Sequence, residues 1–200
     1  FQFSSPGNFW AYNKSESRNF AQELRLQTSF DGAINGMIGG IYESERFPFR
    51  QNVNLVPVGL DPVTGRFDSF SGLWNSSSKT YSAFGQLTID ILENLQLAGG
   101  ARYTSQSYRT MGGNDYVHGV FAGFGFSRAA GDYITGKSSD DNVSPEATLT
   151  WHPTPDTTLY AAYKTGFKSG GYAQTNLVTQ AFTEDTIRFS PEKVKGFELG

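Results

Sequence analysis

The chain has 200 residues with 16 basic and 19 acidic side chains, and its net charge of -3 argues against a nucleic-acid partner. It contains no cysteine, which excludes disulfide bonds and thiolate metal sites. Its 17 phenylalanines, 10 tyrosines and 23 glycines favour strands and turns over helices. No apolar run reaches the roughly 18 residues that a membrane-spanning helix needs.

Residues 1–19 show no periodicity and are predicted to be loop. Residues 20–28 then alternate between apolar and polar side chains, as a strand with one apolar face does. Residues 34–42 are predicted to form the return strand, with Ile34 and Tyr42 on one face, although glycines weaken the alternation. These two segments make the first predicted hairpin.

The clearest hairpin has arms at residues 81–91 and 95–104, which both alternate between an apolar and a mainly polar face. Each arm is about ten residues long, whereas an ordinary strand has about five or six. A tilted strand needs roughly 9–11 residues to cross a bilayer. The lengths therefore predict strands that cross a membrane.

Residues 143–152 and 157–167 repeat this alternation and form a third predicted hairpin. Pro145 lies near the start of its strand, where a missing ladder donor is tolerated. Residues 193–200 begin a further strand, which brings the predicted total to about seven.

The predicted connections alternate between short turns and long loops, and the long loops (43–79, 105–142 and 168–192) all lie at the same end of the strands. They have about 25 to 40 residues, although unstructured connections above about 12–15 residues are uncommon in compact domains. Outer-membrane barrels combine short periplasmic turns with long external loops and carry aromatic girdles at both interfaces. The predicted girdle residues are Phe20, Tyr42, Tyr81, Tyr103 and Phe167 at the external rim and Trp151 at the periplasmic rim.

We therefore predict an all-β fold, an antiparallel transmembrane β-barrel segment of about seven strands from a larger barrel. One charged residue, Lys195, falls on the apolar side, near the external rim, where its head group can reach water. The residues predicted to face the lumen are Glu23, Arg25, Arg102, Glu146 and Lys164. Those predicted to contact outer-membrane lipid are Leu24, Leu26, Leu87, Ile89, Leu97, Leu149 and Leu159.

Six short stretches add a more specific signal, although each alone is weak. They are FAQELRL (20–26), YSAFGQ (81–86), LAGGARY (97–103), YAAYKTGFKSGG (160–171), FSPE (189–192) and FELG (197–200). In this order and spacing they resemble the TonB-dependent outer-membrane receptors, over nearly all of the chain from Phe20 onward.

The resemblance implies a barrel of about 22 strands with a plug domain in its lumen, in the Gram-negative outer membrane. It implies that residues 1–200 are part of one barrel domain, with the plug domain and the C-terminal strands outside this sequence. It also implies import to the periplasm with energy from TonB, which contacts the plug. The commonest ligand of the family is a ferric siderophore, with cobalamin, haem and glycans as alternatives, and its ligand contacts vary too widely to be carried over.

No motif predicts catalysis, a cofactor or a metal. Gly166–Gly171 lacks the spacing of a phosphate-binding loop, and nothing matches a nucleophile elbow. His118 and His152 have no second ligand at metal spacing, and Asp140–Asn142 lacks the spacing of a calcium loop. The sequence therefore favours a protein that is not an enzyme.

Aromatic residues gather in the second long loop, at Tyr116, His118, Phe121, Phe124 and Phe126. They form a ligand platform at the barrel mouth, with Tyr116, His118 and Phe121 as the candidate contacts, or else they pack the loop against its neighbours. Two other functions stay open at this point: a passive porin and a soluble all-β glycan-binding module. A plug domain upstream would distinguish an active receptor from both.

Overall fold

A computed structural model describes residues 2–3, 9–55, 58–125, 127–174 and 177–200. They form one nine-stranded sheet, a small two-stranded sheet and two one-turn helices. The large sheet contains β1 (Gln2–Phe3), β2 (Phe9–Ser15), β3 (Arg18–Gln27), β4 (Ile34–Asn54), β5 (Phe70–Leu92), β6 (Leu95–Val117), β7 (Ile134–Thr154), β8 (Thr157–Lys168) and β11 (Glu192–Leu199). The remaining elements are α1 (Gly119–Ala122), β9 (Gly171–Tyr172), α2 (Glu184–Ile187) and β10 (Arg188–Phe189). No helix in the described part of the chain has the length and apolar character to cross a membrane.

Every strand pair in the large sheet is antiparallel, and the order is β1-β2-β4-β5-β6-β7-β8-β11, with β3 also paired to β4. The predicted strands fall within β3, β4, β5, β6, β7, β8 and β11, apart from residues at their ends. The prediction of an antiparallel all-β segment is confirmed.

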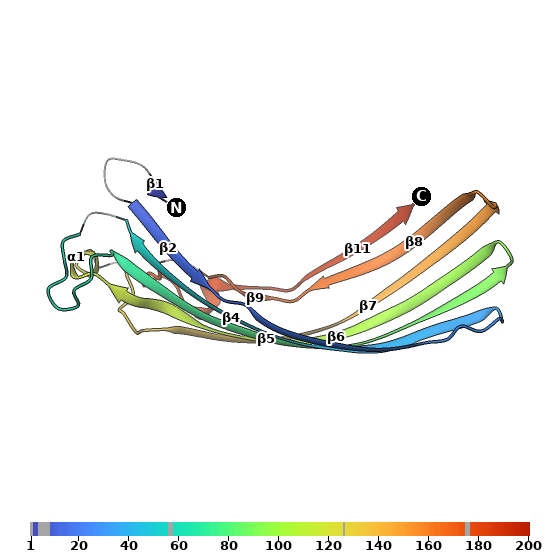
Figure 1. Ribbon diagram of the computed structural model, residues 1–200, viewed down its shortest axis with the longest axis horizontal. Coiled ribbons are helices and arrows are strands. Elements are labelled where there is room, and N and C mark those ends of the chain that lie inside the picture. The colour runs from blue at the N-terminus through green and yellow to red at the C-terminus, as the bar shows by residue number, and fades with distance from the viewer. Residues whose placement is uncertain (1, 4–8, 56–57, 126, 175–176) are drawn as a thin grey trace.

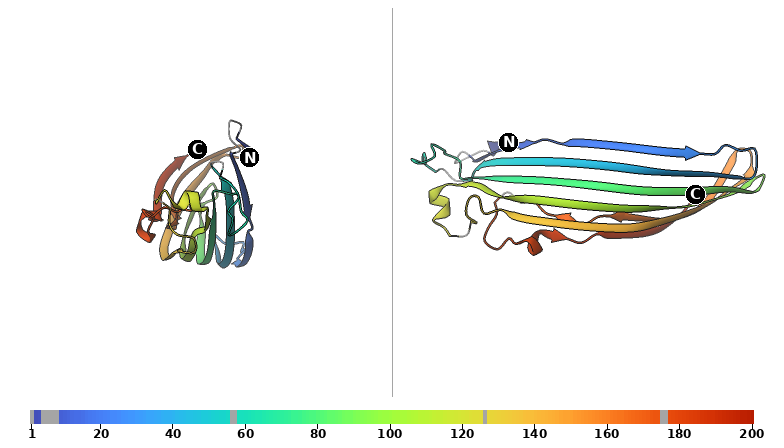
Figure 2. Two further views of the ribbon diagram at one scale, coloured as in Figure 1. Left: turned by 90° about the vertical axis from the view of Figure 1, so that its left-hand side faces the viewer. Right: turned by 90° about the horizontal axis from the view of Figure 1, so that it is seen from below.

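The sheet is rolled into an open trough. The end-on view in Figure 2 shows the strands arranged around a concave interior, with the two chain termini on opposite edges of the opening. In Figure 1 the short turns lie at one end of the trough, and α1, β9 and the longer connections lie towards the other. A sheet with this curvature and two unpaired edges is a piece of a barrel wall.

The loops predicted from the sequence are longer than the connections in the structure. The stretch 1–19 contains β2, β4 and β5 leave only 55–69 between them, and β6 and β7 leave only 118–133. The predicted loops include residues 1, 4–8, 56–57, 126 and 175–176, which lie outside the described residues. The physical reason is that alternation marks a strand only where one face is apolar. Where both faces of a strand meet water, the strand continues through sequence that is polar on both sides.

Pro48 explains why β2 and β3 are separate elements. Both pair with β4 in one continuous register, Ser15 opposite Phe49 and Arg18 opposite Arg46. Between these pairs the Glu16 N–H donates to the Pro48 carbonyl at 3.1 Å. Proline has no N–H for the return bond, so the ladder is interrupted there. β2 and β3 are thus one long strand with a single missing bond.

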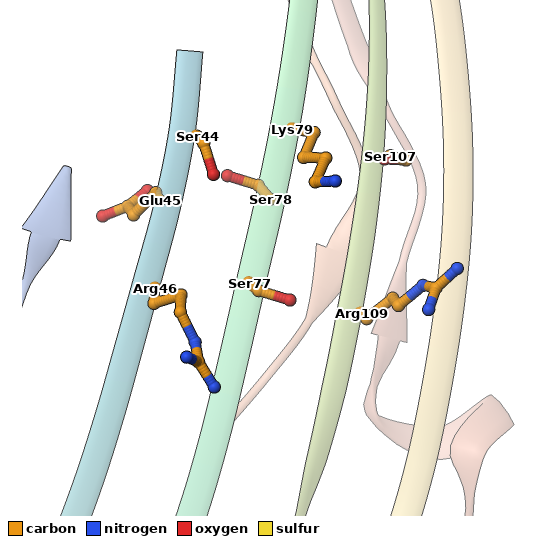
Figure 3. Close-up of a pocket in the computed structure, with 8 residues that line it drawn as sticks. All are labelled: Ser44, Glu45, Arg46, Ser77, Ser78, Lys79, Ser107 and Arg109. Carbon is orange, nitrogen blue, oxygen red and sulfur yellow. The ribbon is translucent and has the colours of Figure 1, made fainter. Parts of the chain in front are cut away.

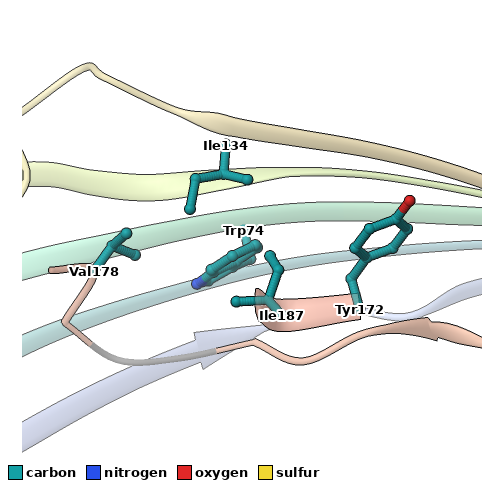
Figure 4. Packing of buried hydrophobic residues seen from close by; sticks show 5 residues of the cluster. All are labelled: Trp74, Ile134, Tyr172, Val178 and Ile187. Atoms are coloured by element: carbon teal, nitrogen blue, oxygen red, sulfur yellow. The ribbon is translucent and has the colours of Figure 1, made fainter. Parts of the chain in front are cut away.

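The described hydrophobic core lies on the concave side, where the connection after β8 folds back over the sheet. Trp74 of β5 is fully buried, and Figure 4 shows side chains from distant segments gathered around it. The cluster contains Trp74, Ile134, Tyr172, Val178 and Ile187. Three of these come from β9, α2 and the segment between them, so the described part of the predicted third loop covers the concave face near the end of the trough that carries the longer connections.

Substituting Gly112 by alanine should destabilise this cover, because the new methyl group would overlap the Trp74 ring. Overpacking of this kind costs about 1–3 kcal/mol. Gly99→Ala on the same strand is the control, since nothing lies within 4 Å of its added methyl group. Hydrogen exchange at the amides of residues 177–187 in the full-length protein checks the difference, and equal protection in the two variants would contradict the packing described.

Candidate functional site

Polar side chains from six strands line the inside of the trough. Arg25 lies opposite Gly39, Gly39 opposite Phe84, and Phe84 opposite Arg102, so this row crosses four strands on one face. The row borders a concave hollow of about 720 Å³. The hollow is also lined by Glu23, Glu43, Thr80, Ser82, Gln86, Thr104, Gln106, Ser144, Glu146 and Lys168.

The structure places the five residues predicted to face the lumen on this one face. Glu23, Arg25, Arg102 and Glu146 line the hollow. Lys164 lies directly opposite Glu146, and its ammonium group is 3.6 Å from a Glu198 carboxylate oxygen on β11. Side chains of directly paired residues share a face, so Lys164 joins the others.

Phe84 is a wall residue that alternation alone did not single out. The Arg102 guanidinium lies 5.0 Å from the Phe84 ring centroid, within the range of a cation–π contact. The ring reaches over Gly39, where any Cβ atom would collide with it. In the sequence, the sign of this role was an aromatic residue at a position that strand alternation assigns to the polar face. The result is an aromatic and cationic strip in the middle of a polar wall.

The residues predicted to contact lipid lie on the opposite, convex face. Ile89, Leu97 and Leu149 are directly paired across β5, β6 and β7. Leu87 keeps 57% of its surface exposed. A contiguous band of such exposed aliphatic side chains is unusual on a face that meets water. Leu24, Leu26, Leu97, Leu149 and Leu159 are also exposed, and Ile89 is half-buried.

Aromatic rings border the apolar band on the convex face. Tyr42 lies between Phe20 and Tyr81, with ring centroids 6.2 Å and 5.0 Å apart. Tyr163 and Phe197 form a further aromatic pair on this face, with ring centroids 5.1 Å apart, in the same row of paired residues as Leu87. Aromatic rings above an aliphatic band are typical of the interface girdles of membrane barrels.

The structure buries the three candidate ligand contacts in packing between loops. The Tyr116 hydroxyl donates to Asp61 at 2.8 Å, and the Arg66 guanidinium lies 4.0 Å from the Tyr116 ring centroid. Phe121 packs against Phe70 with ring centroids 5.8 Å apart. This geometry favours local packing over an open platform, and ligand contact by these residues stays a prediction.

Electrostatics hold the Asp61 contact in place. The pKa of the Asp61 carboxyl lies far below its usual value, because the Val63 N–H and the Tyr116 hydroxyl both donate to it. Burial raises the pKa of the Tyr116 hydroxyl, so it keeps its proton and its role as donor at neutral pH. The connection 55–69 is therefore tied to the end of β6.

His118 has a structural role in the same region. Its Nδ1 accepts from the Val120 N–H at 3.2 Å, which caps α1, and its Nε2 lies 3.1 Å from the Gly59 carbonyl. One neutral tautomer, with the proton on Nε2, satisfies both contacts. Phe124 is the exposed aromatic residue of the patch, and Phe126 lies outside the described residues.

The other candidate ion ligands are occupied by local contacts. The His152 Nδ1 lies 3.1 Å from the Thr158 hydroxyl, and Asp140 accepts from the Gly170 N–H at 3.0 Å. The Asn142 amide donates to the Ser144 hydroxyl at 2.8 Å. Within the described ranges, no three His, Asp or Glu side chains gather in a metal-binding arrangement.

Comparison with known proteins gives one consistent result. The family described as "TonB dependent receptor-like, beta-barrel" matches residues 1–200. The pesticin receptors of Yersinia enterocolitica and Yersinia pestis are each 29% identical over 179 residues, which is 90% of this chain and 23% of theirs. The crystal structure of the ferric yersiniabactin uptake receptor FyuA from Yersinia pestis superposes with a TM-score of 0.75 at 20% identity, over 100% of this chain and 28% of that one.

The chain thus spans about a quarter of the length of these relatives. The shared fold is the barrel wall seen in Figure 2, and it differs from the two-layer core of a soluble β-sandwich. With a family match over its whole length, this chain belongs to the TonB-dependent receptors and supplies part of their outer-membrane β-barrel.

Proposed function

We propose that this chain is part of the wall of an active uptake receptor that imports a ferric siderophore into the periplasm. The observation that carries the proposal is the family match over residues 1–200. The relatives named above include two pesticin receptors and one receptor for ferric yersiniabactin uptake. A ferric siderophore is the ligand class that the second of these names suggests for this chain.

The concave wall suits a lumen that holds a plug. Its charged groups are spread over neighbouring strands, with Arg25 3.9 Å from Glu23 and Lys164 3.6 Å from Glu198. Such exposed pairs stabilise the wall only weakly, so they can exchange partners with a moving plug at small cost. We assign Glu23, Arg25, Arg102, Glu146 and Lys164 to plug contact, and energy from TonB reaches the substrate path through that plug.

Uptake of iron-55 by a deletion strain tests the function. A strain that lacks the full-length receptor should lose uptake of one ferric siderophore from a panel that includes ferric yersiniabactin, and the gene should restore it. Removal of TonB should abolish the restored uptake. Uptake that persists without TonB would indicate a passive porin, and unchanged uptake of every ferric siderophore tested would contradict the ligand class.

A further inference from the structure

Three cations and three serines form a recess on the convex face, just beyond the aromatic rings. Arg46 lies opposite Ser77, and Ser77 lies opposite Arg109. Lys79 lies one step nearer the aromatic rings on the same face. The recess has a volume of about 310 Å³, and Figure 3 shows these side chains on three neighbouring strands. We call it the convex cationic recess, and it comprises Ser44, Arg46, Ser77, Lys79, Ser107 and Arg109.

The depth of the recess is set by the aromatic residue on each strand. Arg46 is four residues beyond Tyr42, and Lys79 is two residues beyond Tyr81. With about 3.3 Å per residue and a strand tilt of about 40°, these cations lie roughly 10 Å and 5 Å further out. The polar layer of a bilayer extends about 5–8 Å beyond the hydrocarbon on each side. Lys79 therefore lies within the head-group layer, and Arg46 lies at its outer boundary, from where its long side chain can reach the head groups. The leaflet is the outer one, because this is the end with the long connections.

These cations differ from Arg50 and Lys14 on the same face, which have carboxylate partners. Arg50 lies 3.4 Å from Asp115, and Lys14 lies 3.8 Å from Glu16. Within the described residues, Arg46, Lys79 and Arg109 form no ion pair. Their side chains are exposed.

Glu45 is the acidic residue that borders the recess. It lies one residue from Arg46, so strand alternation assigns it to the concave face. Figure 3 shows it pointing away from Lys79 and Arg109. Lys137 lies opposite Arg109 on β7 and adds to the positive charge of the same face. The recess thus has uncompensated positive charge at head-group depth.

We propose that the convex cationic recess binds the phosphate groups of a phosphorylated glycolipid in the outer leaflet. Arginine forks and lysine ammonium groups form strong charge-assisted hydrogen bonds with phosphate oxygens, and the serine hydroxyls supply further donors. The exposed leucine and aromatic side chains below the recess offer a surface for the acyl chains of the same molecule. The occupant is a lipid rather than a transported solute, because the face that carries the recess is turned away from the lumen.

Lipid titration of the purified full-length receptor, read by native mass spectrometry, tests the proposal. The probe is bis-phosphorylated lipid A, compared with phosphatidylcholine, which has no net charge. The Arg46→Gln/Arg109→Gln variant should bind lipid A more weakly by about fivefold for each cation lost, hence about 25-fold for the pair. The matched control is Lys14→Gln/Arg50→Gln, which removes two cations from the same face that already have carboxylate partners. It should change the affinity less than about twofold.

Several outcomes would overturn the assignment. Equal affinity of the two double variants for lipid A would show that net charge, and not the recess, decides binding. Equal binding of phosphatidylcholine and lipid A by the unmodified receptor would remove the role of phosphate. Full displacement of lipid A by inorganic phosphate at an equal phosphate concentration would contradict a lipid ligand. None of these results bears on siderophore uptake, which is measured separately.

Discussion

Replacing Leu87 by arginine should destabilise the receptor in a lipid bilayer by about 2–4 kcal/mol, the cost of a cation near the middle of the membrane on a lipid-facing barrel position. Leu87 lies six residues from Tyr81 and four from Ile91 on the convex face of β5. At about 3.3 Å per residue and a tilt of about 40°, this puts it roughly 15 Å below the external ring and 10 Å above the other end. Reversible unfolding from lipid vesicles measures the difference.

Gln86→Arg, one residue away, is the control for that experiment. Gln86 lines the concave hollow, where a long charged side chain stays in a polar environment. We expect a change below about 0.5 kcal/mol, as for most surface substitutions. Similar losses for both variants would mean that the two faces meet the same solvent, and the placement of the convex face in lipid would be wrong.

The fold was predictable from sequence where the two faces of a strand meet different solvents. Leu87 and Gln86 are neighbours with opposite environments, and alternation separates them without any tertiary information. The same reasoning failed above the aromatic rings. At Ser44 to Arg46 and Ser76 to Lys79 the side chains are polar on both faces, so nothing in the pattern distinguishes a strand from a loop.

Long-range contacts set a second limit on prediction. Trp74 and Val178 are each fully buried and lie in one cluster, yet they are more than a hundred residues apart and neither belongs to a periodic segment. Tyr116 and Asp61 are likewise brought together only by the folded loops. The aromatic content of the second loop was visible in the sequence, but its packing against another loop was not.

The convex cationic recess could be recognised only once the strand register was known. Arg46 and Arg109 are far apart in the sequence and belong to no recognisable motif. The pairing of β4, β5 and β6 aligns both with Ser77. Charge at each position could be read from the sequence, whereas its gathering at one depth follows only from the register.

We use the name concave cover for the described residues between 171 and 189 that lie over the concave face. Asn114 should contribute more to its stability than any other single residue. Its side chain is fully buried, donates to the carbonyls of Arg128 and Val178 at 2.7 Å each, and accepts from the Val178 N–H at 3.0 Å. Asn114 thus pairs with the backbone of Val178 much as a neighbouring strand would. Asn114→Ala removes all three hydrogen bonds and leaves the Val178 N–H buried without this acceptor. Such losses cost about 2–4 kcal/mol in total.

That cost should appear as local opening of residues 177–187 and not as loss of the barrel, because the ladders between long strands do not involve Asn114's side chain. We expect hydrogen exchange at the Val178 amide to accelerate by about 30- to 1,000-fold, the equivalent of that free energy. Asn75→Ala, an exposed amide on the convex face of β5, should leave the exchange rate unchanged. If Val178 stays equally protected in both variants, Trp74 and its apolar neighbours hold the cover by themselves, and the hydrogen bonds of Asn114 are secondary.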